Sequence, residues 1–135
     1  MGKVVLGTIA GFLVWLVVWI GGEMVLSAIW PEWYGAHQRA FTAAIKTGSS
    51  FAADATILVI HVVFATFIAM LAGFVAAWIA RGNKRAPLAL GVLLLALGIL
   101  KAAMSWPLVP IWYHLAFTAV LLPMAIVGGR WVPAK

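Results

Sequence analysis

Four long apolar runs, separated by short polar stretches, organise the chain. Each run lies within or above the range of about 17–25 residues that a helix needs to cross a bilayer. A signal peptide would have a shorter apolar region followed by a small-residue cleavage site, so we expect the first run to be retained as a helix. The pattern predicts four transmembrane helices, at about residues 4–28, 51–80, 88–106 and 111–127.

Residues 31–50, between the first two runs, mix polar and aromatic side chains. The more apolar of them share one side of a helix: Trp33, His37, Ala40, Phe41, Ala44 and Ile45. This pattern predicts an amphipathic helix on the membrane surface, with Trp33 and Tyr34 at the depth of the lipid headgroups; an ordinary loop is the alternative. Ser49 or Ser50 is expected to cap the helix that follows.

The composition identifies the class of protein. Hydrophobic residues make up 66% of the 135 residues and charged residues only 9%, whereas soluble domains are about 25% charged. The chain is therefore expected to be an integral membrane protein. It contains no cysteine, which excludes disulfides, thiolate metal sites and thiol redox chemistry.

The distribution of basic residues predicts an orientation. The net charge of +6 does not predict nucleic-acid binding, because the basic residues stand at the ends of apolar runs. One side of the predicted membrane carries Lys3, Arg81, Lys84, Arg85, Arg130 and Lys135, and the other carries Arg39 and Lys46. The positive-inside rule then places both termini in the cytoplasm and the 31–50 segment outside.

The predicted fold is one domain, residues 1–135, built as an all-α antiparallel four-helix transmembrane bundle with the lipid bilayer as its expected partner. Small residues recur at helical spacing and predict where the helices approach closely. They are Gly7 and Gly11; Ala65, Ala69, Gly73 and Ala77 below His61; and Gly91 and Gly98. These faces pack either within the chain or against a second copy, so a homo-oligomer or a larger membrane complex stays open. Gly128 and Gly129 are expected to end the fourth helix.

Most of the eight tryptophans fit aromatic belts at the two membrane surfaces. Trp30, Trp33, Trp106 and Trp112 would form the outer belt, and Trp78 and Trp131 the inner one. Trp15 and Trp19 lie deeper, on the face of the first helix that carries Glu23. They are expected to pack in the core, and the wall of a ligand cavity is their alternative use.

Each predicted transmembrane helix contributes one ionisable residue at a broadly similar depth of the outer half, namely Glu23, His61, Lys101 and His114, and Asp54 lies above them, nearer the water. Such a residue facing lipid costs at least a few kcal/mol, so we expect the four to form a polar cluster inside the bundle. In the simplest interpretation, Glu23 and Lys101 form an ion pair to which the histidines are hydrogen-bonded. Alternatively, the Lys101 side chain reaches up to the interface.

Other chemistry is open to the same residues. Glu23, His61 and His114 form a two-histidine, one-carboxylate set that suits Zn²⁺, although Lys101 would disfavour a cation there. His61 and His114 would hold a haem if they faced each other. Membrane carboxylates and histidines also serve as proton relays in transporters. A hydrolase would need a nucleophile or metal motif beside Glu23 and His61, and the sequence has none.

We therefore expect no catalytic residue, no enzyme activity and no cofactor. The expected function is that of an accessory or assembly-forming membrane subunit with a structural polar cluster. The alternative is an outward-facing binding or proton-coupled transport site for a small solute, a metal ion or haem. In size and helix number the chain is similar to the small multidrug-resistance transporters, but their essential glutamate lies in mid-helix, whereas Glu23 lies near a helix end.

Two stretches carry a further resemblance. Residues 72–80, AGFVAAWIA before a basic turn, and residues 110–117, PIWYHLAF followed by Pro123 and Gly128-Gly-Arg130, resemble a broad set of small uncharacterised bacterial four-helix membrane proteins. The resemblance covers the second to fourth helices. It implies a bacterial inner-membrane setting and supplies no function.

Overall fold

The computed structural model describes residues 2–47, 51, 53–106 and 108–133, and all regular structure in these ranges is helical. Five α-helices occur with one short π-helical turn, η1, in the order α1 (Gly2–Ile29), η1 (Pro31–Gly35), α2 (Ala36–Thr47), α3 (Ala55–Ile79), α4 (Arg85–Ser105) and α5 (Ile111–Arg130). Four of them, α1, α3, α4 and α5, are long and apolar enough to cross a membrane. The fold is therefore that of a multi-pass membrane protein.

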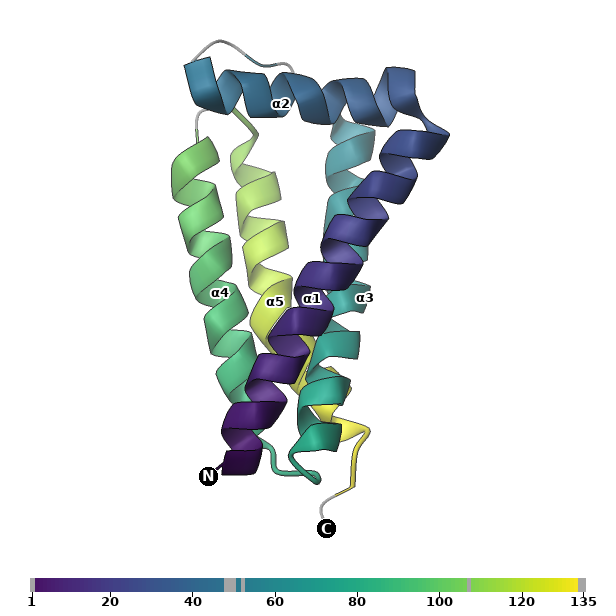
Figure 1. The fold of residues 1–135 in the computed structure, drawn as a ribbon. Coiled ribbons are helices and arrows are strands. Elements are labelled where there is room, and N and C mark those ends of the chain that lie inside the picture. The colour runs from purple at the N-terminus through teal and green to yellow at the C-terminus, as the bar shows by residue number, and fades with distance from the viewer. Residues whose placement is uncertain (1, 48–50, 52, 107, 134–135) are drawn as a thin grey trace.

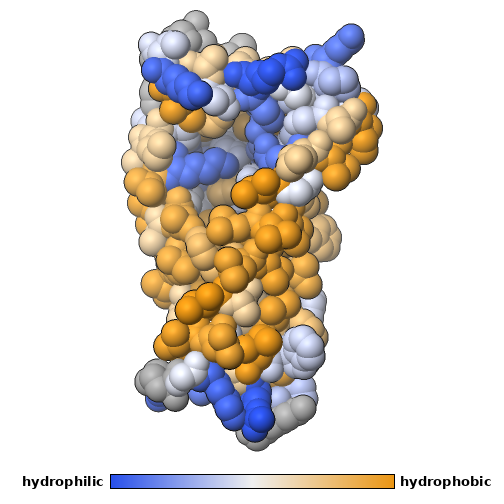
Figure 2. Space-filling model, viewed as in Figure 1, coloured by the Kyte–Doolittle hydropathy of each residue, from blue (hydrophilic) through white to orange (hydrophobic). Residues whose placement is uncertain are grey.

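The four long helices form a bundle, and α2 lies across one end of it (Figure 1). Both termini and the turn between α3 and α4 lie at the opposite end (Figure 1). Hydrophobic residues cover the flank of the bundle, and hydrophilic residues gather at its two ends (Figure 2). This division matches a molecule whose middle zone meets lipid and whose ends meet water.

The start of α3 differs from the predicted start at residue 51. The helix begins at Ala55 because the Asp54 side chain caps it, accepting hydrogen bonds from the backbone N–H of Thr56 at 2.8 Å and of Ile57 at 3.3 Å. The indole of Trp33 also donates to Asp54, over 2.8 Å, and this bond holds the pKa of the Asp54 carboxyl below its usual value. The predicted caps Ser49 and Ser50 lie outside the described residues.

The end of α5 also differs from the prediction, since the helix runs through Gly128 and Gly129 to Arg130. Both glycines are buried packing positions. A Cβ on Gly128 would collide with the backbone carbonyl of Met70 in α3, and a Cβ on Gly129 would collide with the ring of Pro87 in α4. The requirement at these positions is thus for close approach rather than for a helix end.

The predicted small-residue faces pack within the chain. Gly7 and Gly11 bring α1 against the backbone of α3, whereas Gly91 and Gly98 receive Leu122 and Leu121 of α5. Gly73 lies directly on the carbonyl of Ala125, so α3 and α5 are in backbone contact. Three of the predicted alanines, Ala65, Ala69 and Ala77, are completely buried.

The contact at Gly73 gives a prediction about stability. An added methyl group at Gly73 has no room because the Ala125 carbonyl occupies its place, so Gly73→Ala should destabilise the protein by about 1–3 kcal/mol. Gly21 has no atom within 4 Å of the same position, and Gly21→Ala should be neutral or stabilising by up to about 1 kcal/mol, the usual gain in a helix. Thermal unfolding in detergent, followed by circular dichroism, measures both. Equal stability of the two variants would contradict the contact.

Candidate functional site

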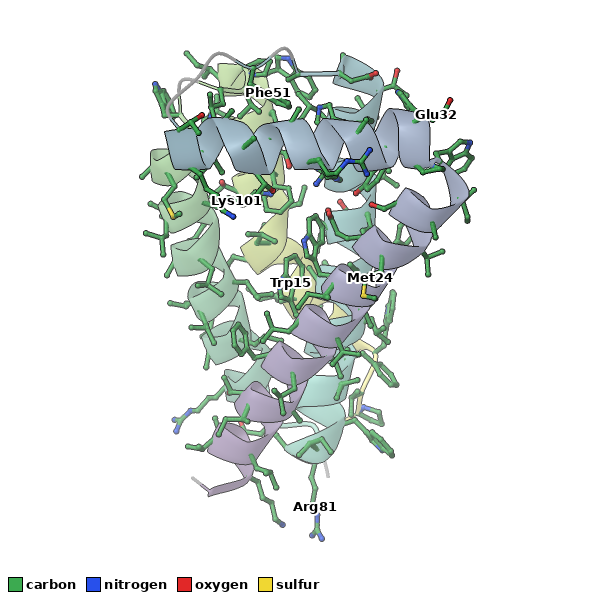
Figure 3. The ribbon with its side chains drawn as sticks, turned by 45° about the horizontal axis from the view of Figure 1, so that its top comes forward. Trp15, Met24, Glu32, Phe51, Arg81 and Lys101 are labelled. Carbon is green, nitrogen blue, oxygen red and sulfur yellow. The ribbon has the colours of Figure 1, made fainter. Side chains whose placement is uncertain are left out.

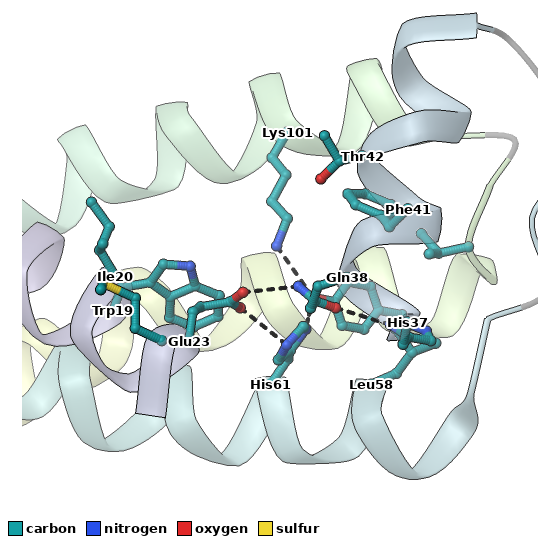
Figure 4. A pocket seen from close by; sticks show the side chains of 13 residues that line it. Trp19, Ile20, Glu23, His37, Gln38, Phe41, Thr42, Leu58, His61 and Lys101 are labelled. Atoms are coloured by element: carbon teal, nitrogen blue, oxygen red, sulfur yellow. Dashed lines mark hydrogen bonds and ion pairs between the residues drawn. The ribbon is translucent and has the colours of Figure 1, made fainter. Parts of the chain in front are cut away.

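Beneath α2 the bundle encloses a cavity of about 410 Å³. Five helices contribute to its wall, through Trp19 and Glu23 of α1, Gln38 of α2, His61 of α3, Lys101 of α4 and Tyr113 of α5. Lys101 reaches from α4 into the space below α2 (Figure 3), toward Glu23, Gln38 and His61 (Figure 4). Three of the four residues predicted to form a polar cluster therefore line one cavity.

The Glu23 carboxylate is surrounded by hydrogen-bond donors. Its Oε1 accepts from the Tyr34 hydroxyl at 3.0 Å, and its Oε2 accepts from the Gln38 amide at 2.9 Å. The Nε2 atom of His61 lies 3.3 Å from Oε1. Burial and the neighbouring carboxylate raise the pKa of Tyr34 above its usual range, so its hydroxyl stays protonated and available as a donor.

His61 connects this carboxylate to Lys101 through two tyrosines. Its Nε2 lies 2.6 Å from the Tyr34 oxygen, and its Nδ1 lies 3.3 Å from the Tyr113 oxygen. Lys101 Nζ donates to the same Tyr113 oxygen over 3.3 Å. The Tyr34 hydroxyl donates to Glu23, so its oxygen accepts the Nε2 proton of His61. With that proton on Nε2, Nδ1 of a neutral ring accepts from the Tyr113 hydroxyl, whose oxygen accepts from Lys101. This direction satisfies every bond with a neutral His61.

A second chain of hydrogen bonds reaches Glu23 from the surface. The backbone N–H of Asp54 donates to His37 Nε2 at 3.1 Å, so the ring proton of His37 is on Nδ1. That nitrogen lies 2.9 Å from the amide oxygen of Gln38, whose nitrogen donates to Glu23. The cap of α3, helix α2 and the carboxylate of α1 thus form one network, and Figure 4 shows the part of it from His37 through Gln38 to Glu23.

Lys101 has a different environment from the one expected. Its Nζ lies 4.1 Å from the ring centroid of Phe117, 5.3 Å from that of Trp19 and 5.6 Å from that of Tyr113, all within range of cation–π attraction. The expected direct ion pair with Glu23 is not formed, since no carboxylate oxygen of the described residues lies within 4.0 Å of the Lys101 ammonium. The lysine is therefore held by aromatic faces and one hydroxyl.

His114 lies apart from the other three predicted residues. Its ring stacks on Trp106, with centroids 4.9 Å apart and planes 7° apart, and its Nε2 lies 3.4 Å from the Trp106 carbonyl. It does not line the cavity with His61 and Glu23. The proposed zinc set is accordingly not assembled, and no group of three or more His, Cys, Asp or Glu side chains in the described ranges is arranged to hold a metal ion. Both ring nitrogens of His61 are hydrogen-bonded, so its ring does not stand free as a haem ligand.

An aromatic layer forms the floor of the cavity. The Trp19 ring stacks on Trp15 at 5.6 Å and on Phe64 at 5.4 Å, and meets the Phe117 ring edge-on at 5.6 Å. Trp15 is buried, whereas Trp19 also faces the cavity. Trp15 thus packs in the core, and Trp19 forms part of the cavity wall.

Five members of the network were not predicted from the sequence: Tyr34, His37, Gln38, Asp54 and Tyr113. Tyr34 was expected among the lipid headgroups, but it is completely buried. Tyr113 precedes His114, and both are buried. The spacing of four residues from Tyr113 through Phe117, Leu121 and Ala125 marks the face that α5 turns to the core, and is the sequence signal that would have selected the tyrosine.

No family model, no curated protein and no solved structure matches this chain. Conclusions about function therefore depend on the geometry of the cavity and its network.

The network predicts a compensating exchange of residues. Glu23→Gln should destabilise the protein by about 1–3 kcal/mol, because an amide can accept from only one of Tyr34 and Gln38 and turns its NH₂ group toward the other donor. The double variant Glu23→Gln/Gln38→Glu exchanges the two side chains. The amide at position 23 then accepts from Tyr34 and donates to the carboxylate at position 38. That carboxylate still accepts from His37. The double variant should recover stability, with a coupling of about 0.5–3 kcal/mol in a double-mutant cycle of unfolding free energies. Purely additive effects would mean that the two side chains do not interact as described.

Proposed function

We propose that this protein is a multi-pass protein of the bacterial inner membrane that binds a small amphipathic molecule in the cavity beneath α2, without catalysing a reaction. Its four long helices form an antiparallel bundle with both termini in the cytoplasm, and α2 lies on the outer surface. The resemblance of residues 72–80 and 110–117 to small bacterial membrane proteins supports the choice of membrane.

The distribution of charge and tryptophan supports the orientation. The turn that carries Arg81, Lys84 and Arg85 lies at the end opposite α2, together with the termini (Figures 1 and 3). Cytoplasmic ends of membrane helices are enriched in Lys and Arg. Six tryptophans that fit two interfacial belts are exposed, namely Trp30, Trp33, Trp78, Trp106, Trp112 and Trp131.

The volume of the cavity is the main observation that supports ligand binding. Protein interiors are close-packed, and few of their voids are larger than a water molecule. A polar cluster with a structural role alone needs its hydrogen bonds satisfied, which the network achieves, but it does not need about 410 Å³ of open space beside it. A cavity of this volume with apolar and aromatic walls and a few convergent polar groups is typical of a small-molecule site.

The packing below the cavity favours binding over passage across the membrane. Below His61, the small residues Ala65 and Ala69 are completely buried, and Trp15 stacks beneath Trp19. Below the cavity the bundle is thus packed on the α3 side, and the space beside Trp15 and Trp19 is a smaller void of about 140 Å³. Neither serine nor cysteine is among the described residues that line the cavity, and Glu23 and His61, the acid and base that a hydrolysis would need, are hydrogen-bonded within the network, which supports a non-catalytic role.

Blocking the mouth of the cavity tests this function. Ile20 lines the cavity and is 54% exposed, so a tryptophan there should fill the opening without disturbing the core. Ile9 is on the same helix, is 52% exposed and does not line the cavity, which makes Ile9→Trp the matched control. Native mass spectrometry of the detergent-solubilised protein, titrated with dodecanoate, dodecanol and dodecylamine, counts the bound molecules.

At least one of these amphiphiles should bind to wild type and to Ile9→Trp with a stoichiometry of one, and about tenfold more weakly to Ile20→Trp. Binding that is equal in all three proteins, or absent from all three for every amphiphile, would refute a ligand site in this cavity.

A further inference from the structure

We propose that Lys101 is an anion-binding subsite for the acidic head of a single-chain amphiphile, which enters the cavity sideways from the lipid between α1 and α4. This inference rests on the proposed function, because it specifies which molecule the cavity binds and by which route.

The ammonium of Lys101 has hydrogen-bonding capacity to spare. It offers three N–H donors, and its one hydrogen bond to a described side chain is the 3.3 Å bond to the Tyr113 hydroxyl. The rings of Phe117 and Trp19 stabilise a positive charge but give its remaining donors no oxygen acceptor. No carboxylate among the described residues lies within 4.0 Å of it. A carboxylate or phosphate head would supply the acceptors.

The negative charge in the cavity, the Glu23 carboxylate, already has hydrogen-bond donors from the protein. Glu23 receives a hydrogen bond from Tyr34 and another from Gln38, and His61 lies beside its Oε1. A cationic head would have to displace these donors to reach the carboxylate, whereas an anionic head reaches Lys101 without breaking a bond. The two charges therefore select an acidic ligand, bound on the α4 side of the cavity, away from Glu23.

The mouth of the cavity opens on the flank of the bundle. Three lining residues are themselves exposed: Ile20 at 54%, Met24 at 68% and Thr42. From the side, the space-filling surface is hollowed directly below the hydrophilic band of α2, with hydrophobic residues beneath the hollow (Figure 2). A molecule at this mouth therefore has its polar end beside α2 and its apolar end at the level of the lipid chains.

The inner wall suits the first part of an apolar chain. Trp19, Phe41 and Leu58 line it between the polar groups, and burying each CH₂ contributes about 0.8 kcal/mol. Free acetate or inorganic phosphate would contact Lys101 but leave this wall uncovered. The acid and the chain are both needed, which distinguishes a lipid-like acid from a free anion.

The test is a comparison of head groups with and without the lysine charge. Native mass spectrometry is performed with dodecanoate, dodecyl phosphate, dodecanol, dodecylamine and acetate on wild type, Lys101→Met, Lys101→Arg, Lys46→Met and Ile20→Trp. Methionine replaces the four-carbon stem of lysine without the charged ammonium, and arginine restores the charge. Lys46, an exposed lysine of α2 outside this cavity, controls for general attraction of anions. Thermal unfolding of each variant verifies that it is folded.

Wild type, Lys46→Met and Lys101→Arg should bind the two acidic amphiphiles about tenfold to a hundredfold more tightly than dodecanol, as expected for a charge-assisted hydrogen bond. Lys101→Met should lose this preference, and acetate should not bind. Equal affinity for dodecanoate and dodecanol in wild type, with sensitivity to Ile20→Trp retained, would overturn the role of Lys101 but leave the cavity as a binding site. If Ile20→Trp weakens the binding of none of these molecules, the proposed function itself is overturned.

Discussion

A carboxylate on a membrane-spanning helix must find its hydrogen-bond donors inside the protein, and the structure around Glu23 is arranged to supply them. Gln38 comes from the surface helix, Tyr34 from the π-helical turn before it, and His61 from α3. These bonds tie α2 and η1 down onto the bundle. The place of α2 across the end of the bundle therefore depends on the carboxylate beneath it.

The same constraint explains why the two halves of the bundle differ. Toward the termini, α3 approaches α1 and α5 until backbones touch, at Gly7, Gly73 and Gly128. Toward α2, the helices are held apart by the large rings of Trp19 and Phe117 and by the polar groups above them. Small residues at one end and aromatic residues at the other give a wedge-shaped bundle, and the cavity is the space that the wedge leaves under α2.

The sequence predicted this architecture through features that depend on one helix at a time. Apolar run length located four helices, and small-residue spacing located the face of α3 that is buried. Depth along each helix placed Glu23, His61 and Lys101 at one level, and these three residues line one cavity. Which way a side chain faces is a different question, since neighbouring residues on a helix point about 100° apart, and this is how Tyr113 rather than His114 came to face the cavity. Tyr34 was misjudged because its aromatic character indicated a headgroup position, whereas the π-helical turn directs it inward.

The central claim is that the polar network borders open space rather than a filled core, and cysteine accessibility measures this directly. The chain has no cysteine of its own, and two neighbouring residues of α3 form a matched pair. Leu58 and Ile57 are almost equally buried, at 2% and 0% exposure, but only Leu58 lines the cavity. A small neutral thiosulfonate reagent, with modification followed by mass, should label Leu58→Cys many times faster than Ile57→Cys. Labelling of both cysteines at the same slow rate would contradict the account.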